Sequence, residues 1–312
     1  MVNWIAEQKH PHSRRRRVTG ASCVAGVICA VVLFHGAQAQ TDNAEIPNFA
    51  PTPYTNWDSP LRYGDRFLPP ESGPGPVEQS PDYPYILNAL GDDTASDPTY
   101  RVSDLSNSIL TPWAIERMQY WNDIALSGDK APFRARSRCY PPGGAAWVIF
   151  RNGGPTSTMQ YFAQLPDQVL MMWRGDNWVR RVYLNVPHSE NLEPSWFGES
   201  VGHYEGDDTL VVDTIGFIQH DLSFVDNYRT PHSDKLHVVE RFVLVDANTM
   251  MVYVHVEDPI AFTTPWKGVV PLVANNRGPI TESICGELGL TPGDASFGYF
   301  TVPILQAESA DF

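Results

Sequence analysis

The chain has 312 residues, and its 36 acidic residues outnumber the 22 basic residues, which gives a formal net charge of −14. A surface this negative repels phosphate backbones and anionic lipid, so we expect no nucleic acid and no membrane surface as partners. The sequence contains no Walker loop, GxGxxG turn, GxSxG elbow, HExxH pair or paired CxxC motif. We therefore expect a protein that works without a cofactor or a bound metal.

Residues 1–39 have the three parts of a cleavable signal peptide. Four consecutive arginines (14–17) precede an apolar run, Val24–Phe34, and the sequence Ala37-Gln38-Ala39 follows it. The run is shorter than the roughly 20 residues that span a bilayer, so we expect cleavage and not a membrane anchor. The predicted location is periplasmic or secreted, by Sec or twin-arginine export. Cleavage would remove five basic residues and one acidic residue, so the counts of 22 and 36 become 17 and 35 and the net charge −18.

Two of the four cysteines would leave with the signal peptide, and Cys139 and Cys285 would remain. Disulfides persist outside the cytoplasm, so we predict a bridge between these two residues. A loop of this length would stabilise the fold by roughly 4–5 kcal/mol in the chain-entropy model. The alternative is a pair of separate buried thiols.

Residues 40–105 form a proline-rich lead, in which ten prolines fall between Pro47 and Pro84. Proline lacks the N–H that helices and sheet ladders need, so this segment is predicted to be extended or irregular. Aromatic residues are interleaved with the prolines, and they favour a strap packed across the domain. A flexible tether is the alternative.

One helix is indicated after this lead. Thr111 is a good N-cap, Pro112 suits the first helical position, and Gly128 can end the helix. An apolar stripe at helical spacing predicts packing against the core. Its members are Ala114, Met118, Trp121 and Ala125.

From residue 146 onward, short runs rich in valine, tyrosine, tryptophan and threonine alternate with turn residues, which predicts strands. Tight turns between sequential strands exclude a parallel α/β sheet, whose crossovers are long. We therefore predict a mainly β domain over 106–300, an antiparallel barrel or strongly curved sheet of calycin or lipocalin type, and a C-terminal tail over 301–312. The expected strands are Ala146–Phe150, Thr158–Gln164, Gln168–Trp173, Trp178–Leu184, Ser200–Glu205, Thr209–Thr214, Leu236–Val245, Met251–Asp258 and Trp266–Val273.

Glu240 is the first candidate for chemistry, because it lies among large apolar residues in the strand Leu236–Val245. A buried carboxylate either finds a partner or has its pKa raised towards the range that a general acid or base needs. The alternative is a salt bridge to a basic residue on a neighbouring strand.

The next strand, Met251–Asp258, carries two further candidates. If its hairpin loop has two or four residues, Glu240 lies opposite His255, and His237 lies opposite Asp258. Each would be a carboxylate–imidazole pair. A loop of three residues would shift the register and break both pairs.

The hairpin between residues 200 and 214 carries two more candidates, His203 and Asp213. Asp213 lies near the end of its second strand, directly after an apolar run. Glu205, Asp207 and Asp208 are interpreted as turn residues. The histidines at 188, 220 and 232 are expected to be exposed in turns.

Several runs together resemble a large family of exported, mostly uncharacterised proteins of Gram-negative bacteria. They are PSWFGESVGHYEGD (194–207), TLVVDT (209–214), LHVVERF (236–242), VEDP (256–259) and FTTPW (262–266). The sequence departs from the family pattern at Asp208, which lengthens the EGD turn. The resemblance implies export but supplies no reaction.

We therefore predict an exported barrel with an apolar pocket for a small organic molecule. In a catalytic version, as a hydratase, lyase or isomerase, cofactor-free proton transfer would use Glu240, Asp258, Asp213 and His237 or His203. In a lipocalin-like version the protein would only bind a ligand, and in a third version its aromatic surface would dock an envelope protein. The expected ligand-binding residues are Tyr204, Arg241, His255 and Trp266.

Overall fold

The computed structural model describes residues 46–59, 67–83, 102–127, 140–141, 143, 160–173, 178–226, 228–276 and 278–280, all within one compact unit, Ala44–Phe312. The predicted signal peptide, the helix end predicted at Gly128, Cys139, Cys285, the strand predicted at 146–150 and the predicted C-terminal tail lie outside the described residues.

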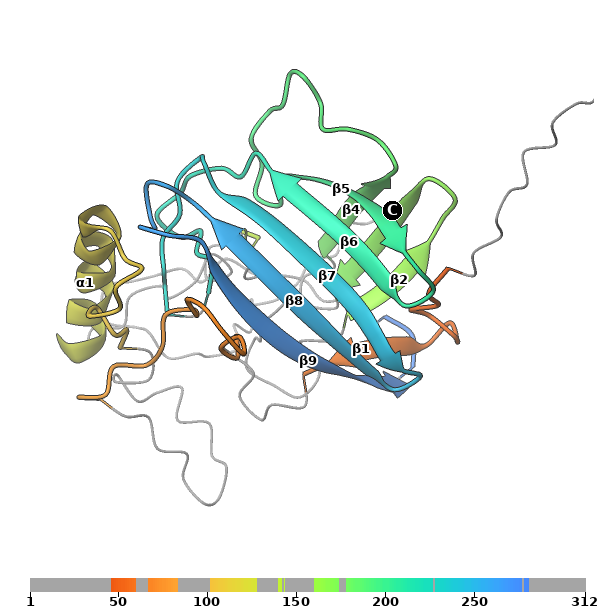
Figure 1. Ribbon diagram of the computed structural model, residues 1–312, viewed down its shortest axis with the longest axis horizontal. Coiled ribbons are helices and arrows are strands. Elements are labelled where there is room, and N and C mark those ends of the chain that lie inside the picture. Colours follow the sequence, from red (N-terminus) through yellow and green to blue (C-terminus); the bar gives the residue numbers. More distant parts are fainter. Residues whose placement is uncertain are drawn as a thin grey trace, which may run out of the picture. The chain divides into compact units, whose positions relative to one another are not determined.

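Nine strands form a closed barrel in chain order, and Figure 1 shows β6 to β9 side by side in that order. The prediction of a mainly β barrel with one helix is confirmed. The strands are β1 (Thr55–Asp58), β2 (Gln160–Gln164), β3 (Gln168–Trp173), β4 (Trp178–Leu184), β5 (Glu199–Glu205), β6 (Thr209–Ile215), β7 (His237–Asp246), β8 (Thr249–Glu257) and β9 (Trp266–Asn276).

One pair of neighbours departs from the expected antiparallel arrangement. β4 and β5 are parallel, and they pair over only three positions, Val182–Leu184 with Ser200–Gly202. A ring of nine strands cannot alternate direction throughout, because an odd number of reversals does not return to the starting direction. A parallel pair also needs a crossover and not a tight turn. Residues 185–198 form that crossover.

The proline-rich lead supplies the strand that closes the ring. β1 pairs with β9 along its whole length and with β2 at Trp57. The Trp57 indole donates to the carbonyl of Phe49 over 2.8 Å. Phe49 is fully buried and stacks on Phe162, with ring centroids 5.2 Å apart. Where it is described, the lead is therefore a packed strap, as its aromatic residues predict.

The helix α1 (Pro112–Ser127) has the predicted start and the predicted buried face. The hydroxyl of Thr111 accepts from the N–H of Ala114 over 3.3 Å, as an N-cap does. The four stripe residues at 114, 118, 121 and 125 are all buried. In the described part of the chain, no helix is both long and apolar enough to cross a bilayer.

Large apolar side chains fill the interior, because alternate residues of each strand point inward. Phe162 and Phe242 meet there edge to face, with ring centroids 5.9 Å apart. Met171, Met250 and Val252 are each 0% exposed in the same cluster. The described interior is thus a packed core, and the groove between β4 and residues 185–198 has a mainly polar lining and lies at the barrel wall.

The β7–β8 hairpin shows why the two expected carboxylate–imidazole pairs are wrong. Its loop does have two residues, with Asp246 opposite Thr249. The register then shifts between Leu244 and Asp246, because Val245 is an extra residue of a β-bulge. Glu240 consequently lies opposite Val254, and His237 lies opposite Glu257.

Candidate functional site

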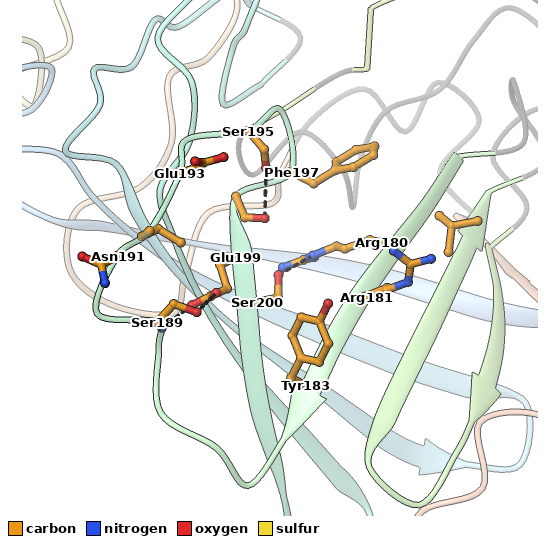
Figure 2. Close-up of a pocket in the computed structure, with 13 residues that line it drawn as sticks. Arg180, Arg181, Tyr183, Ser189, Asn191, Glu193, Ser195, Phe197, Glu199 and Ser200 are labelled. Atoms are coloured by element: carbon orange, nitrogen blue, oxygen red, sulfur yellow. Dashed lines mark hydrogen bonds between the residues drawn. The ribbon is translucent and has the colours of Figure 1, made fainter.

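A groove of about 480 Å³ lies at the short parallel seam between β4 and β5. Figure 2 shows β4 on one side, with Arg180, Arg181 and Tyr183, and the crossover on the other. Gly198, at the end of the crossover, has a φ of 64°, and a Cβ there would lie 2.5 Å from the carbonyl oxygen of Ile215. Glycine therefore lets the chain pass close to β6 as it enters β5. The crossover and the start of β5 contribute Ser189, Asn191, Leu192, Glu193, Ser195, Phe197, Gly198, Glu199 and Ser200.

A buried polar network lies beneath this groove. Four consecutive strands, β4 to β7, each contribute one inward-facing residue: Arg180, Ser200, Thr214 and Glu240. Arg180 donates from Nε to Ser200 Oγ over 3.0 Å and from Nη2 to Thr214 Oγ1 over 2.8 Å. The same Nη2 donates to Glu240 Oε2 in an ion pair. The salt bridge considered for Glu240 is therefore present, but its partner lies three strands away across the barrel.

Two atoms of this ion pair have no hydrogen-bond partner among the described residues. They are Arg180 Nη1 and Glu240 Oε1, and both are buried. Arg180 is 4% exposed and Glu240 1%, yet Arg180 also lines the groove. A buried polar group without a partner costs about 1–3 kcal/mol, and more when it is charged, so the described network satisfies this ion pair only in part.

The crossover is tied to the barrel through Glu199, at the start of β5. The Glu199 carboxylate accepts from the backbone N–H of Ser189 over 2.7 Å and from its hydroxyl over 2.5 Å. Its Oε1 also lies 3.1 Å from Nδ1 of His188. Partial burial alone would raise the pKa of Glu199, but the bonds from Ser189 and His188 hold it below its ordinary value.

His188 continues this contact to the next strand. Its Nε2 lies 3.0 Å from Oδ1 of Asp213, and Nε2 of His237 lies 3.1 Å from the same oxygen. A neutral imidazole has one N–H, so His188 can donate to both Glu199 and Asp213 only when it carries a second proton. The row goes on across β7 and β8, where His237 Nδ1 is 3.8 Å from Glu257 and Glu257 accepts from His255 over 2.6 Å.

Asp213 and His237 lie at the centre of the row of histidine and carboxylate side chains that runs from Glu199 to His255, and each shifts the pKa of the other. The hydrogen bond to Asp213 raises the pKa of His237. The bond from His237, and next the bond from His188, lower the pKa of Asp213. The His237 contribution to stability is thus present below about pH 6.5 and is lost as the pH rises through its raised pKa. The Asp213 contribution is present above about pH 3.9 and is lost as the pH falls through its lowered pKa.

Asp213→Asn should lower the pKa of His237 towards its ordinary value, because the substitution removes the charge that favours the imidazolium. Proton NMR titration of the His237 Cε1–H measures this directly. An unchanged His237 titration would show that Asp213 does not hold that proton.

Of the five residues predicted to be catalytic, one contacts a residue that lines the groove, and two more are linked to the groove only through His188. Glu240 binds Arg180 beneath it, and Asp213 and His237 follow His188 on the outer face. Asp258 lies elsewhere and is 2% exposed. Its carboxylate accepts from the N–H and hydroxyl of Ser233 and from the N–H of Ile260, so it organises a turn.

The other predicted residues are distributed around the barrel. His203 and Arg241 both contact Glu205 on the exposed outer face, and Tyr204 accepts from Gln164 over 3.0 Å near the strap. His255 contacts Glu257 at the far end of the outer row. Trp266 is a core residue packed against Phe67 and Phe262. None of these five lines the groove.

The expectation that His232 is an exposed turn residue is wrong. It is 2% exposed, with Nε2 2.7 Å from the hydroxyl of Ser223 and Nδ1 2.9 Å from the carbonyl of Ser233. Burial lowers the pKa of His232. The carbonyl can only accept, so Nδ1 carries the proton and Ser223 donates to Nε2. His188 and His220 are likewise only partly exposed.

Sequence reasoning overlooked Arg180, Glu199 and His188 as site residues. Arg180 is an inward position in a strand whose bounds, Trp178–Leu184, were correctly predicted, so alternation along that strand would have indicated its burial. Across the described segments, no three His, Cys, Asp or Glu residues are arranged to hold a metal ion. Comparison with protein-family models, curated proteins and solved structures found no match to this chain.

Proposed function

We propose that this protein binds a small polar organic molecule in the groove between β4 and the crossover. The observation that carries the proposal is a concave groove lined by the exposed Arg181 and by the largely buried guanidinium of Arg180. Ser200 and Thr214 fix its orientation, so its position is set before a ligand arrives. A few fixed polar groups in a concave site are what specific small-molecule binding requires.

The composition of the lining favours a polar ligand. Hydroxyl, amide, carboxylate and guanidinium groups outnumber the aliphatic and aromatic side chains among the residues that line the groove. The volume of about 480 Å³ is within the range of roughly 300–1,000 Å³ that small-molecule sites occupy. Export, as the signal-like residues 1–39 indicate, would place this binding outside the cytoplasm.

Cofactor-independent acid/base catalysis is the second candidate. Glu199 borders the groove and is joined to His188, which contacts Asp213. A carboxylate backed by an imidazole can exchange a proton with a bound molecule and with the outer face of the barrel. Conversion of a bound compound, lost in His188→Gln while binding persists, would identify this version.

Native mass spectrometry of the purified chain tests binding. We expect an added mass that corresponds to a small molecule. Ser195→Trp, which fills the groove from the crossover, should lose it. Val245→Trp places the same side chain at an exposed residue of the β-bulge and should keep it. A ligand retained by Ser195→Trp, or a wild-type chain that carries none and binds none from a metabolite extract, would refute the proposal.

A further inference from the structure

Both arginines of the pair Arg180-Arg181 line the groove, although neighbouring residues of a strand point to opposite faces. The short seam explains this. β5 pairs with β4 only from Val182 onward, so no strand of the described residues lies beside the first half of β4 on that side. The groove therefore reaches both faces of β4 at these two residues.

The two guanidinium groups differ in how much of their charge and hydrogen-bonding capacity remains available to a ligand. The charge of Arg180 is balanced by Glu240. Arg181 is exposed, and among the described residues no acidic group forms an ion pair with it. Arg181 is thus a cation in the groove with its hydrogen-bonding edge available, and that edge matches a carboxylate in geometry.

The acidic residues that line the groove are compatible with a carboxylate bound to Arg181. Glu199 is engaged by Ser189 and lies beside His188, so its charge is largely satisfied. Glu193 is exposed on the crossover. A ligand with several negative charges would be repelled by Glu193 and by the net charge of the chain. A single carboxylate is compatible with both.

The rest of the lining presents neutral hydrogen-bonding groups. Tyr183 lies on the same outward face of β4 as Arg181, and Asn191 and Ser195 lie on the crossover opposite. A hydroxyl, phenol or amide of this kind exchanges hydrogen bonds with the hydroxyl groups of a ligand.

We infer that the ligand of this groove is a small hydroxylated monocarboxylic acid, such as a sugar acid. Arg181 binds its carboxylate, and Tyr183, Asn191 and Ser195 face its hydroxyl groups. The inference rests on the proposed binding function and adds the ligand class.

Isothermal titration of the full chain with gluconate and with sorbitol tests the class, because the two differ mainly by the carboxylate. Gluconate should bind at least about tenfold more tightly than sorbitol, which corresponds to one charge-assisted hydrogen-bonded pair. Arg181→Gln should remove that preference, and Arg181→Lys should restore only part of it. Lys267→Gln removes the same charge from an exposed position on β9, outside the groove, and should leave gluconate affinity unchanged.

Equal affinities for gluconate and sorbitol, both abolished by Ser195→Trp, would overturn the ligand class and leave the groove as a binding site. Unchanged gluconate affinity in Arg181→Gln would overturn the role of Arg181. If neither compound binds, the ligand class is wrong, and the co-purification experiment decides the binding function separately.

Discussion

Glu240→Ala should lower the free energy of unfolding by about 3–5 kcal/mol, because it leaves the buried guanidinium of Arg180 without a counter-charge. Ser200 and Thr214 still accept hydrogen bonds from Arg180, but neither carries a charge. Urea denaturation followed by tryptophan fluorescence and circular dichroism measures the loss.

Two further variants separate the ion pair from general damage. Arg180→Met with Glu240→Leu removes both charges, and such replacements are often neutral or stabilising, so most of the loss should be recovered. Arg241→Met breaks an ion pair at the next residue of β7, on the exposed face, and should leave stability unchanged within error. A Glu240→Ala variant as stable as Arg241→Met would show that the Arg180 charge is solvated.

Phe49→Ala should lower the free energy of unfolding by about 3–5 kcal/mol, the usual cost of removing a buried phenylalanine ring. The ring is 0% exposed and stacks on Phe162, which in turn contacts Phe242 in the barrel core. The hydrogen bonds of this residue use its backbone, with Gln164 and Trp57 as partners, so the substitution reports on the ring alone.

Tyr54→Ala is the matched control, because this aromatic residue of the same strap is 46% exposed. Its substitution should have little effect on chemical denaturation. Phe49→Leu should recover part of the lost stability by refilling the space. If Phe49→Ala were as stable as Tyr54→Ala, the strap would not belong to the cooperative unit.

The sequence was sufficient for elements whose signals are local. Alternation of apolar residues located β3 and β4 at their observed bounds, Gln168–Trp173 and Trp178–Leu184. Thr111 and Pro112 fixed the start of α1, because a cap and a first-turn proline act within one turn.

Features that depend on residues distant in the chain could not be predicted from the sequence. β1 consists of only four residues, and it is a strand because β9 pairs with all of them. The bulge at Val245 moved the register by one residue, and nothing in the local composition marks it. The partner of Glu240 is 60 residues away in the chain, on a strand that does not adjoin β7.

The site depends on both kinds of information. Glu240, Asp213 and His237 stood out as polar residues in apolar strands. The odd number of strands in the ring requires a parallel pair, and in this barrel that pair is the short seam between β4 and β5, where the groove lies. Only closure of the barrel reveals that seam, so Arg180 could be predicted as buried but not as part of a groove.

A crystal structure of the chain purified with its co-purifying molecule tests the central claim most directly. We predict electron density for a small polar molecule between β4 and the crossover, within hydrogen-bonding distance of Arg180 or Arg181. Density for the bound molecule inside the barrel or on another face, with only solvent in the groove, would contradict this account.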